Sequence, residues 1–281
     1  MKLINVDLYD YFNVKKPEGG VGVLTAYIMD NSGEVNANRK HPAMLVLPGG
    51  GYAMTSDREA EPIALRYLGY GWNSFVLRYS VAPVKYPYCL AEAIMAMNYI
   101  RINADELHID KNKVAAIGFS AGGHLAAMLG SYYDSPEAAE VFKSRVSARP
   151  DAIVLSYAVI TSGAKTHGGS FTNLCGDDNP DLKAKLDIKN LVNENSSPAF
   201  IWATYTDNAV PIRNSLIAAT AYEEAGVSFA VHIWGKGCHG LSLDDATVFN
   251  CVEPINDASK SIPEWVALSI EWMGELGIKV E

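Results

Sequence analysis

Features that mark membrane, secreted and nucleic-acid-binding proteins are missing from this sequence. No apolar run approaches the roughly 18–20 residues that a membrane helix needs. Polar residues interrupt the first seven positions too early for a secretory signal. Only 23 Lys and Arg oppose 32 Asp and Glu, for a formal net charge of −9, whereas a phosphate backbone requires many basic contacts. We therefore expect no membrane or nucleic-acid partner, and a cytoplasmic protein.

Cysteine is also scarce. The four cysteines are Cys89, Cys175, Cys238 and Cys251. They form neither a C-x-x-C pair nor the spacing of a zinc site, so we expect free thiols and no metal site. Apolar residues make up 49 % of the chain and charged residues 20 %, which excludes general disorder.

Short apolar runs alternate with longer helical stretches along the 281 residues. Strands are expected at residues 21–29, 43–47, 72–79, 114–119, 152–156, 199–205 and 228–234. Helices are expected at residues 59–68, 88–103, 121–133, 211–225 and 262–276. This alternation predicts an α/β fold with a mostly parallel sheet, covered by helices on both faces.

One stretch, residues 160–197, does not follow the alternation. It contains four glycines and an Asp-Asp-Asn-Pro run. We interpret residues 1–281 as a single domain and this stretch as an excursion between two strands. Such loops often shape a substrate site, so the excursion is a candidate small cap.

The strongest local motif is Gly-Phe-Ser-Ala-Gly at residues 118–122. An apolar strand is predicted before it and a helix after it, which is the context of a G-x-S-x-G nucleophile elbow. The turn would lift the Ser120 hydroxyl above the sheet and place the Ala121 N–H at a helix N-terminus, where negative charge is stabilised. The alternative is a Gly-rich turn without a chemical role.

A second motif, Pro-Gly-Gly-Gly-Tyr, occupies residues 48–52 after a predicted strand. Esterases of the α/β-hydrolase class use such a loop to point backbone N–H groups at an oxyanion. The expected donors are Gly50, Gly51 and Ala121. A phosphate-binding loop is the rival, but these residues match neither G-x-x-x-x-G-K-[ST] nor G-x-G-x-x-G. A purely structural turn is the other alternative.

A serine nucleophile needs a base and an acid that orients it. His239 lies in a Gly-rich loop directly after the last predicted strand, and Asp207 ends a strand between Ser120 and His239 in chain order. Rival carboxylates lie in the excursion, where none directly follows an apolar strand: Asp177, Asp178 and Asp187. The spacing therefore predicts a catalytic triad of Ser120, Asp207 and His239.

Five other histidines are not expected to act as the base. His124 is expected to pack or hydrogen-bond behind the nucleophile, and His232 falls inside a strand. His41 and His108 are expected at the surface. His167 lies in the excursion, where a solvated loop position is favoured over a substrate contact.

These motifs resemble the α/β-hydrolase serine esterases, in the branch near the acetylxylan esterases and hormone-sensitive-lipase-like enzymes. The likeness spans roughly residues 20–275, and its landmarks are residues 48–52, 56–59, 118–124, Asp207 with Val210-Pro211, and His239-Gly240. It implies an α/β-hydrolase fold of about eight strands. It also implies a serine carboxylesterase without metal or organic cofactor.

The resemblance further implies small acyl substrates, especially acetyl groups on xylose-based oligosaccharides. One departure is Pro48, which stands where lipase-like relatives have His. Within the 56–59 landmark, Arg58 and Glu59 either order the oxyanion loop or begin a helix in solvent. Both hypotheses stay open.

The expected partner is a small-molecule ester, such as an acetylated oligosaccharide. Tyr52 and Tyr205 are the candidate substrate contacts, with Tyr79, Tyr157 and Trp202 as further walls of the site. Three alternatives remain: an arylformamidase-type amidase, a short-chain lipase-like esterase, and a hydrolase-shaped binding protein without turnover. The sequence does not indicate an oligomeric state.

Overall fold

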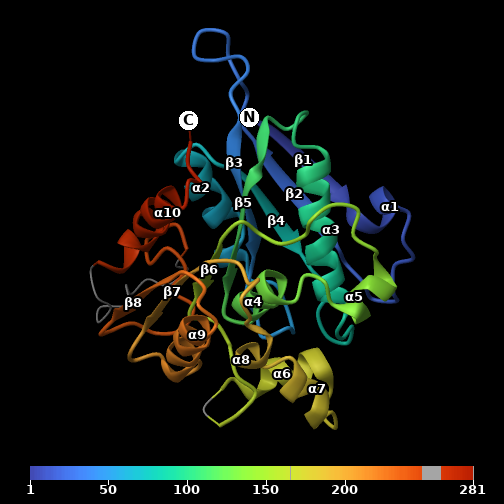
Figure 1. Ribbon diagram of the computed structural model, residues 1–281, viewed down its shortest axis with the longest axis vertical. Coiled ribbons are helices and arrows are strands. Elements are labelled where there is room, and N and C mark those ends of the chain that lie inside the picture. Colours follow the sequence, from blue (N-terminus) through green and yellow to red (C-terminus); the bar gives the residue numbers. More distant parts are fainter. Residues whose placement is uncertain (165, 249–260, 281) are drawn as a thin grey trace.

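The architecture is a single twisted sheet with helices on both faces (Figure 1). A computed structural model describes residues 1–164, 166–248 and 261–280, so Cys251 lies outside the described residues. The eight-stranded sheet has the order β1-β2-β4-β3-β5-β6-β7-β8. Its strands are β1 (Lys2–Asp7), β2 (Val23–Ile28), β3 (His41–Leu47), β4 (Asn73–Arg78), β5 (Ile109–Phe119), β6 (Ile153–Ser156), β7 (Ala199–Thr204) and β8 (Phe229–Trp234).

Strands β3, β4, β5, β6, β7 and β8 run parallel to one another. Strand β2 pairs antiparallel with both β1 and β4. The predicted mostly parallel sheet is therefore confirmed. Strand β1 was not predicted. It is an edge strand, and none of its residues is fully buried, so its sequence lacks the continuous apolar run of a central strand.

Helices on the two faces enclose two separate apolar clusters. One face carries α1 (Leu8–Phe12), α3 (Tyr88–Ile102), α4 (Ala121–Ser131), α5 (Pro136–Val141) and α9 (Arg213–Glu224). The other face carries α2 (Glu61–Gly69) and α10 (Trp265–Glu275). None of these helices, nor any other described helix, has the length and apolarity required to cross a membrane.

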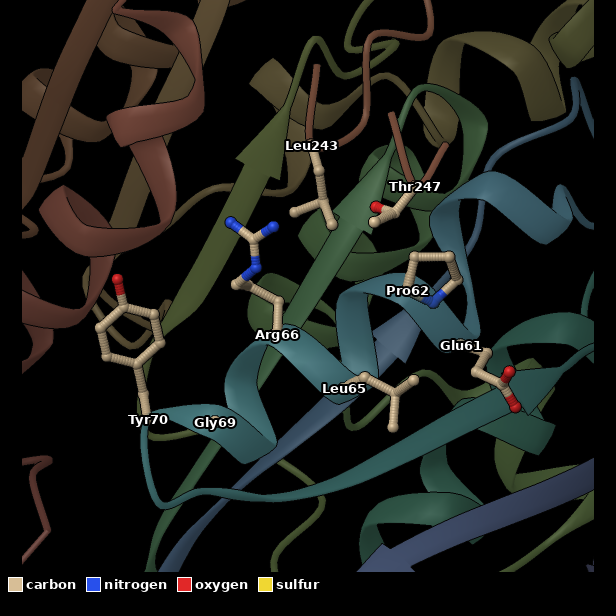
Figure 2. Close-up of a pocket in the computed structure, with 8 residues that line it drawn as sticks. All are labelled: Glu61, Pro62, Leu65, Arg66, Gly69, Tyr70, Leu243 and Thr247. Atoms are coloured by element: carbon tan, nitrogen blue, oxygen red, sulfur yellow. The ribbon is translucent and has the colours of Figure 1, made fainter. Parts of the chain in front are cut away.

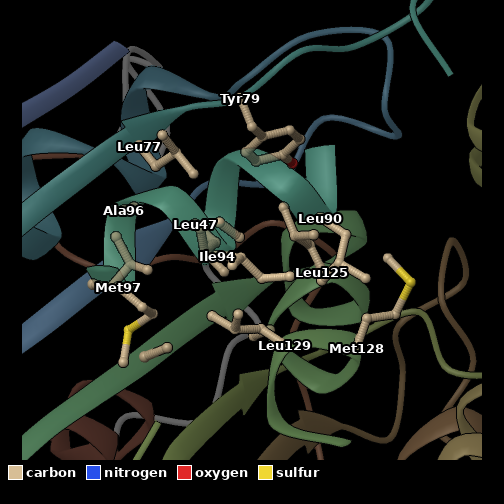
Figure 3. Close-up of a cluster of buried hydrophobic side chains, with 14 of the residues drawn as sticks. Leu47, Leu77, Tyr79, Leu90, Ile94, Ala96, Met97, Leu125, Met128 and Leu129 are labelled. Carbon is tan, nitrogen blue, oxygen red and sulfur yellow. The ribbon is translucent and has the colours of Figure 1, made fainter. Parts of the chain in front are cut away.

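Strand β3 shows why the central strands are apolar throughout. Its seven residues are all buried. Leu45 and Leu47 pack into the cluster under α3 and α4, while Met44 and Val46 pack into the cluster under α2 and α10. Figure 3 shows the first cluster, where side chains of α3 and α4 meet those of the sheet.

His41 is buried, so the predicted surface position is wrong. Strand β3 begins at this residue, two positions earlier than expected. Its side chain is 3 % exposed, and its ring nitrogens contact the Gly71 carbonyl and the Asn31 amide oxygen at 2.9 and 3.1 Å. One of these oxygens accepts the N–H of the neutral ring in the interior. His108 remains partly exposed.

The excursion over residues 160–197 folds into three short helices between β6 and β7 (Figure 1). They are α6 (Gly168–Cys175), α7 (Pro180–Lys185) and α8 (Ile188–Leu191). Two short 3₁₀ helices, η1 (Asp57–Glu59) and η2 (Ile262–Glu264), complete the described elements.

Candidate active site

Ser120 lies at the turn between β5 and α4, with φ 51° and ψ −117°. The surrounding backbone maintains this strained conformation by packing tightly around the turn, which leaves no room for side chains at Gly118 and Gly122. A Cβ atom on Gly118 would lie 2.0 Å from the Gly122 carbonyl oxygen, and one on Gly122 would lie 2.1 Å from the Leu47 carbonyl oxygen. The two glycines of the motif are therefore required by the turn, as the elbow interpretation expects.

Ser120, His239 and Asp207 meet through two hydrogen bonds. His239 Nε2 lies 2.8 Å from Ser120 Oγ, and His239 Nδ1 lies 2.7 Å from Asp207 Oδ2. The other Asp207 oxygen accepts backbone N–H bonds from Ala209 and Val210, each 2.9 Å long. The buried carboxylate is thus fixed in place and bonds to Nδ1 of the imidazole, which leaves Nε2 directed at the serine.

The loop that carries His239 is anchored to the end of β7. The hydroxyls of Thr204 and Thr206 both donate to the Gly237 carbonyl, at 3.0 and 2.9 Å. The Tyr157 ring packs edge-on against the imidazole, with ring centroids 5.1 Å apart. These contacts restrict the orientation of the His239 ring.

The Gly-rich loop after β3 presents unpaired backbone donors beside the serine. Gly50 and Gly51 have φ values of 129° and 65°, which favour glycine. Among the described residues, no acceptor takes the N–H of Gly50, Gly51 or Ala121. Because Gly50 and Gly51 line the same cavity as Ser120, their N–H groups are available to a ligand oxygen there.

Glu59 connects this loop to the loop of His239. One carboxylate oxygen accepts the Gly49 N–H at 2.8 Å, and the other accepts the Tyr157 hydroxyl at 2.6 Å. The Tyr157 oxygen in turn accepts the Ser242 N–H at 2.9 Å. Burial raises the pKa of Glu59, whose side chain is only 3 % exposed. Of the two hypotheses for Glu59, these contacts favour loop ordering, and a solvated helix start is wrong.

The cavity at the serine has a volume of about 310 Å³. Besides the residues already described, it is lined by Arg58, Met54 and two side chains of the excursion, His167 and Asn173. Asn173 Nδ2 donates to the Gly51 carbonyl at 2.8 Å, so α6 holds the Gly-rich loop. His167 is exposed, in agreement with the favoured solvated position, and it also lines the cavity. The individual contacts of His167 and Asn173 depend on how the excursion packs, which local sequence does not specify.

Two predicted substrate contacts are not at this cavity. Tyr52 is 2 % exposed, and its hydroxyl meets His124 Nδ1 at 2.9 Å beneath the loop. Tyr205 is 68 % exposed but is not among the described residues that line the cavity. His124 forms a second bond to the Leu186 carbonyl at 2.8 Å, and its predicted role in hydrogen bonding behind the nucleophile is confirmed.

A larger cavity of about 540 Å³ lies on the outer side of α2 (Figure 2). It is lined by Leu65, Arg66 and Tyr70 of this helix region together with Leu243 and Thr247. It contains no residue of the Ser120–His239–Asp207 cluster. The smaller cavity is therefore the candidate active site.

The sheet order, the strained serine turn and the strand-end Asp and His define an α/β hydrolase. Residues 29–222 match the BD-FAE family, and the chain belongs to that family.

A solved structure, the acetyl ester-xyloside bifunctional hydrolase from Caldicellulosiruptor lactoaceticus, is 34 % identical, with a TM-score of 0.83 over 98 % of this chain and 97 % of that one. Two curated relatives are also similar. Endo-1,4-beta-xylanase B of Butyrivibrio fibrisolvens is 35 % identical over 85 % of this chain and 38 % of its own length. An acetylxylan esterase of Xylanibacter ruminicola is 26 % identical over 79 % and 46 %. This chain thus spans less than half the length of either curated relative.

Proposed function

We propose that this chain is a serine esterase that removes small acyl groups, acetyl above all, from carbohydrate esters such as acetylated xylo-oligosaccharides. The observation that carries the proposal is the pair of hydrogen bonds, 2.8 and 2.7 Å long, that joins Ser120 to Asp207 through His239. Such a chain of nucleophile, base and orienting acid is what acyl transfer requires.

The reaction proceeds through an acyl-enzyme. Ser120 Oγ attacks the acyl carbonyl carbon while its proton passes to His239 Nε2. The tetrahedral intermediate then expels the alcohol, which takes the proton from His239. A water molecule repeats the sequence on the acyl-enzyme and releases the carboxylic acid. Asp207 keeps the imidazole oriented and stabilises its positive form in both halves.

The N–H groups of Gly50, Gly51 and Ala121 bind the oxyanion of each tetrahedral intermediate. Their backbone positions are set before substrate arrives, so no reorganisation is needed during the reaction. In comparable sites each donor lowers the barrier by about 3 kcal/mol.

Two observations support a small acyl group on a carbohydrate. The cavity volume of about 310 Å³ lies at the small end of the roughly 300–1,000 Å³ typical of ligand cavities. In addition, similar proteins carry the names acetylxylan esterase and acetyl ester-xyloside hydrolase.

The first test is an acyl-length series of p-nitrophenyl acetate, butyrate and octanoate with the wild-type protein and Ser120→Ala. We expect kcat/KM to be highest for acetate. The variant should lose at least about 10³-fold in kcat, because no other group supplies the nucleophile, while its melting temperature stays unchanged.

Other outcomes of these assays would point to a different function or mechanism. Highest activity on octanoate would indicate a lipase-like esterase. Cleavage of an N-formyl arylamine without cleavage of any ester would indicate the amidase. Full activity of Ser120→Ala would refute the proposed mechanism altogether.

A further inference from the structure

Arg58 is an exposed cation at the border of the candidate active site. It lines the cavity that contains Ser120 and His239. It also lines a neighbouring cavity of about 430 Å³, which it shares with Asp57 and Arg78. A substrate that extends out of the catalytic cavity along this side therefore passes the Arg58 side chain.

The guanidinium of Arg58 has no hydrogen bond or ion pair with any described residue. The two carboxylates beside it in the chain have other partners. Asp57 pairs with Arg78 at 2.7 Å, and both oxygens of Glu59 accept the bonds described above. Within the described part of the chain, the donors of Arg58 are therefore unused and available to a ligand.

The position of Arg58 relative to His239 identifies the part of the substrate that it meets. A Cβ atom added to Gly240, the residue after the base, would lie 3.3 Å from Arg58 Nη2. In the proposed mechanism His239 delivers its proton to the departing alcohol, so groups next to His239 belong to the alcohol side of the ester.

We propose that Arg58 binds a carboxylate on the alcohol portion of the substrate, so that the site prefers anionic esters such as acetylated oligosaccharides with a uronic-acid substituent. A guanidinium binds a carboxylate through two parallel hydrogen bonds, and a protein with a net charge of −9 repels anions unless a local cation attracts them. The proposal rests on the proposed esterase function.

The competing explanation is that Arg58 only offsets the buried charge of its neighbour Glu59. In that case removal of Arg58 would disturb the Gly49 and Tyr157 contacts of Glu59. The loss of activity would then be the same for neutral and anionic substrates. The charge of the substrate therefore separates the two roles.

The experiment compares 4-acetoxybenzoate with its neutral analogue 4-acetoxybenzamide on the wild-type protein, Arg58→Gln and Arg58→Lys. Lys236→Gln is the matched control, because Lys236 is an exposed cation of the His239 loop that is not among the described residues lining the cavity. We expect Arg58→Gln to lower kcat/KM for the benzoate by roughly three- to tenfold, mainly through KM, and for the benzamide by less than about twofold.

Arg58→Lys should retain part of the preference, Lys236→Gln should retain all of it, and 0.5 M salt should reduce it. Weaker binding of the product 4-hydroxybenzoate to Arg58→Gln, measured by calorimetry, would support the same conclusion without turnover. An equal effect on both esters, or no effect on either, overturns the proposal while the esterase function stands. If the wild-type protein cleaves neither ester, the esterase function itself fails and this proposal fails with it.

Discussion

At the scale of single residues, Glu59 is the group that couples the two halves of the candidate site. It is a buried carboxylate whose oxygens accept one bond from the oxyanion loop and one from Tyr157, which in turn contacts the His239 loop. A buried carboxylate needs such donors, because burial without them is costly. The position of the oxyanion donors therefore depends on a side chain that does not itself act on the substrate in the proposed mechanism.

Glu59→Gln should lower kcat on the order of tenfold and leave KM nearly unchanged. The amide retains one acceptor oxygen and presents an NH₂ group where the second acceptor was, so one of the two bonds is lost. A hydrogen bond to a charged group contributes roughly 1.5–3 kcal/mol. Steady-state kinetics on p-nitrophenyl acetate measures this effect.

Glu61→Gln is the matched control for this prediction. Glu61 is exposed on the next turn and accepts a hydrogen bond from the Tyr27 hydroxyl at 3.0 Å, remote from the loop. We expect its kinetics to match the wild-type protein. Equal kinetics for the Glu59 variant would show that the carboxylate does not position the oxyanion loop.

At the scale of secondary-structure elements, the geometry of the elbow depends on how closely α4 approaches β3. The first turn of α4 contains Gly122 and Gly123, and Cβ atoms at these positions would lie 2.1 Å from the Leu47 carbonyl oxygen and 2.5 Å from the Ala158 side chain. The helix can pack against the strand ends only because these residues lack side chains.

Gly122→Ala should destabilise the protein by about 2 kcal/mol or more, because its Cβ would meet backbone oxygens of Leu47 and Pro48 that cannot move independently. Gly274→Ala is the helical control, since nothing lies within 4 Å of the added Cβ in α10. It should be neutral or raise stability by roughly 0.5–1 kcal/mol. Urea denaturation of both variants tests the contrast, and similar stabilities would contradict it.

At the scale of the whole molecule, two buried titratable groups oppose each other in their effect on the pH dependence of stability. Burial lowers the pKa of His124 from 6.5 to about 4. Its Nε2 faces a carbonyl, which only accepts, so the ring is neutral with the proton on Nε2. Burial raises the pKa of Glu92 from 4.5 to about 7. Its carboxylate contacts Tyr9 and Ser80.

The sign of each contribution follows from these directions. The folded protein disfavours protonated His124. Neutral His124 therefore adds to the free energy of unfolding above pH 6.5, and this gain is lost as the pH falls toward 4. The folded protein disfavours ionised Glu92. Protonated Glu92 therefore adds to the free energy of unfolding below pH 4.5, and this gain is lost as the pH rises toward 7. Each shift corresponds to roughly 3 kcal/mol, and the two largely cancel between pH 4.5 and 6.5.

His124→Gln should therefore be less stable than the wild-type protein at pH 7, with a difference that narrows by roughly 2–3 kcal/mol on acidification to pH 4.5. Glu92→Gln should show the opposite trend. The wild-type protein loses the stabilisation from protonated Glu92 as the pH rises, so the difference in the free energy of unfolding between the two proteins narrows. Urea denaturation at pH 4.5, 5.5 and 7 measures both. Differences that do not change with pH would contradict the assignment.

Among the predictions made from the sequence, the central strands and the chain positions of Ser120, Asp207 and His239 agree with the structure. The central strands are continuous apolar runs because both their faces are buried. Ser120 directly follows β5, Asp207 lies three residues after the end of β7, and His239 lies five residues after the end of β8. Parallel strands end at one edge of the sheet. The structure brings these side chains within hydrogen-bond distance, although their catalytic roles remain a proposal.

By itself, the sequence determined the mostly parallel α/β sheet and the chain positions of the candidate triad, since periodicity and turn chemistry are properties of neighbouring residues. The α/β-hydrolase fold was implied by the resemblance of the motifs to that family. Only the tertiary structure decided that Glu59 bridges two loops, that His167 and Arg58 border the cavity, and that Tyr52 is buried against His124. These facts depend on contacts between residues tens of positions apart. Local pattern carries no information about such contacts, because they are formed by the packing of the helices and loops against the sheet.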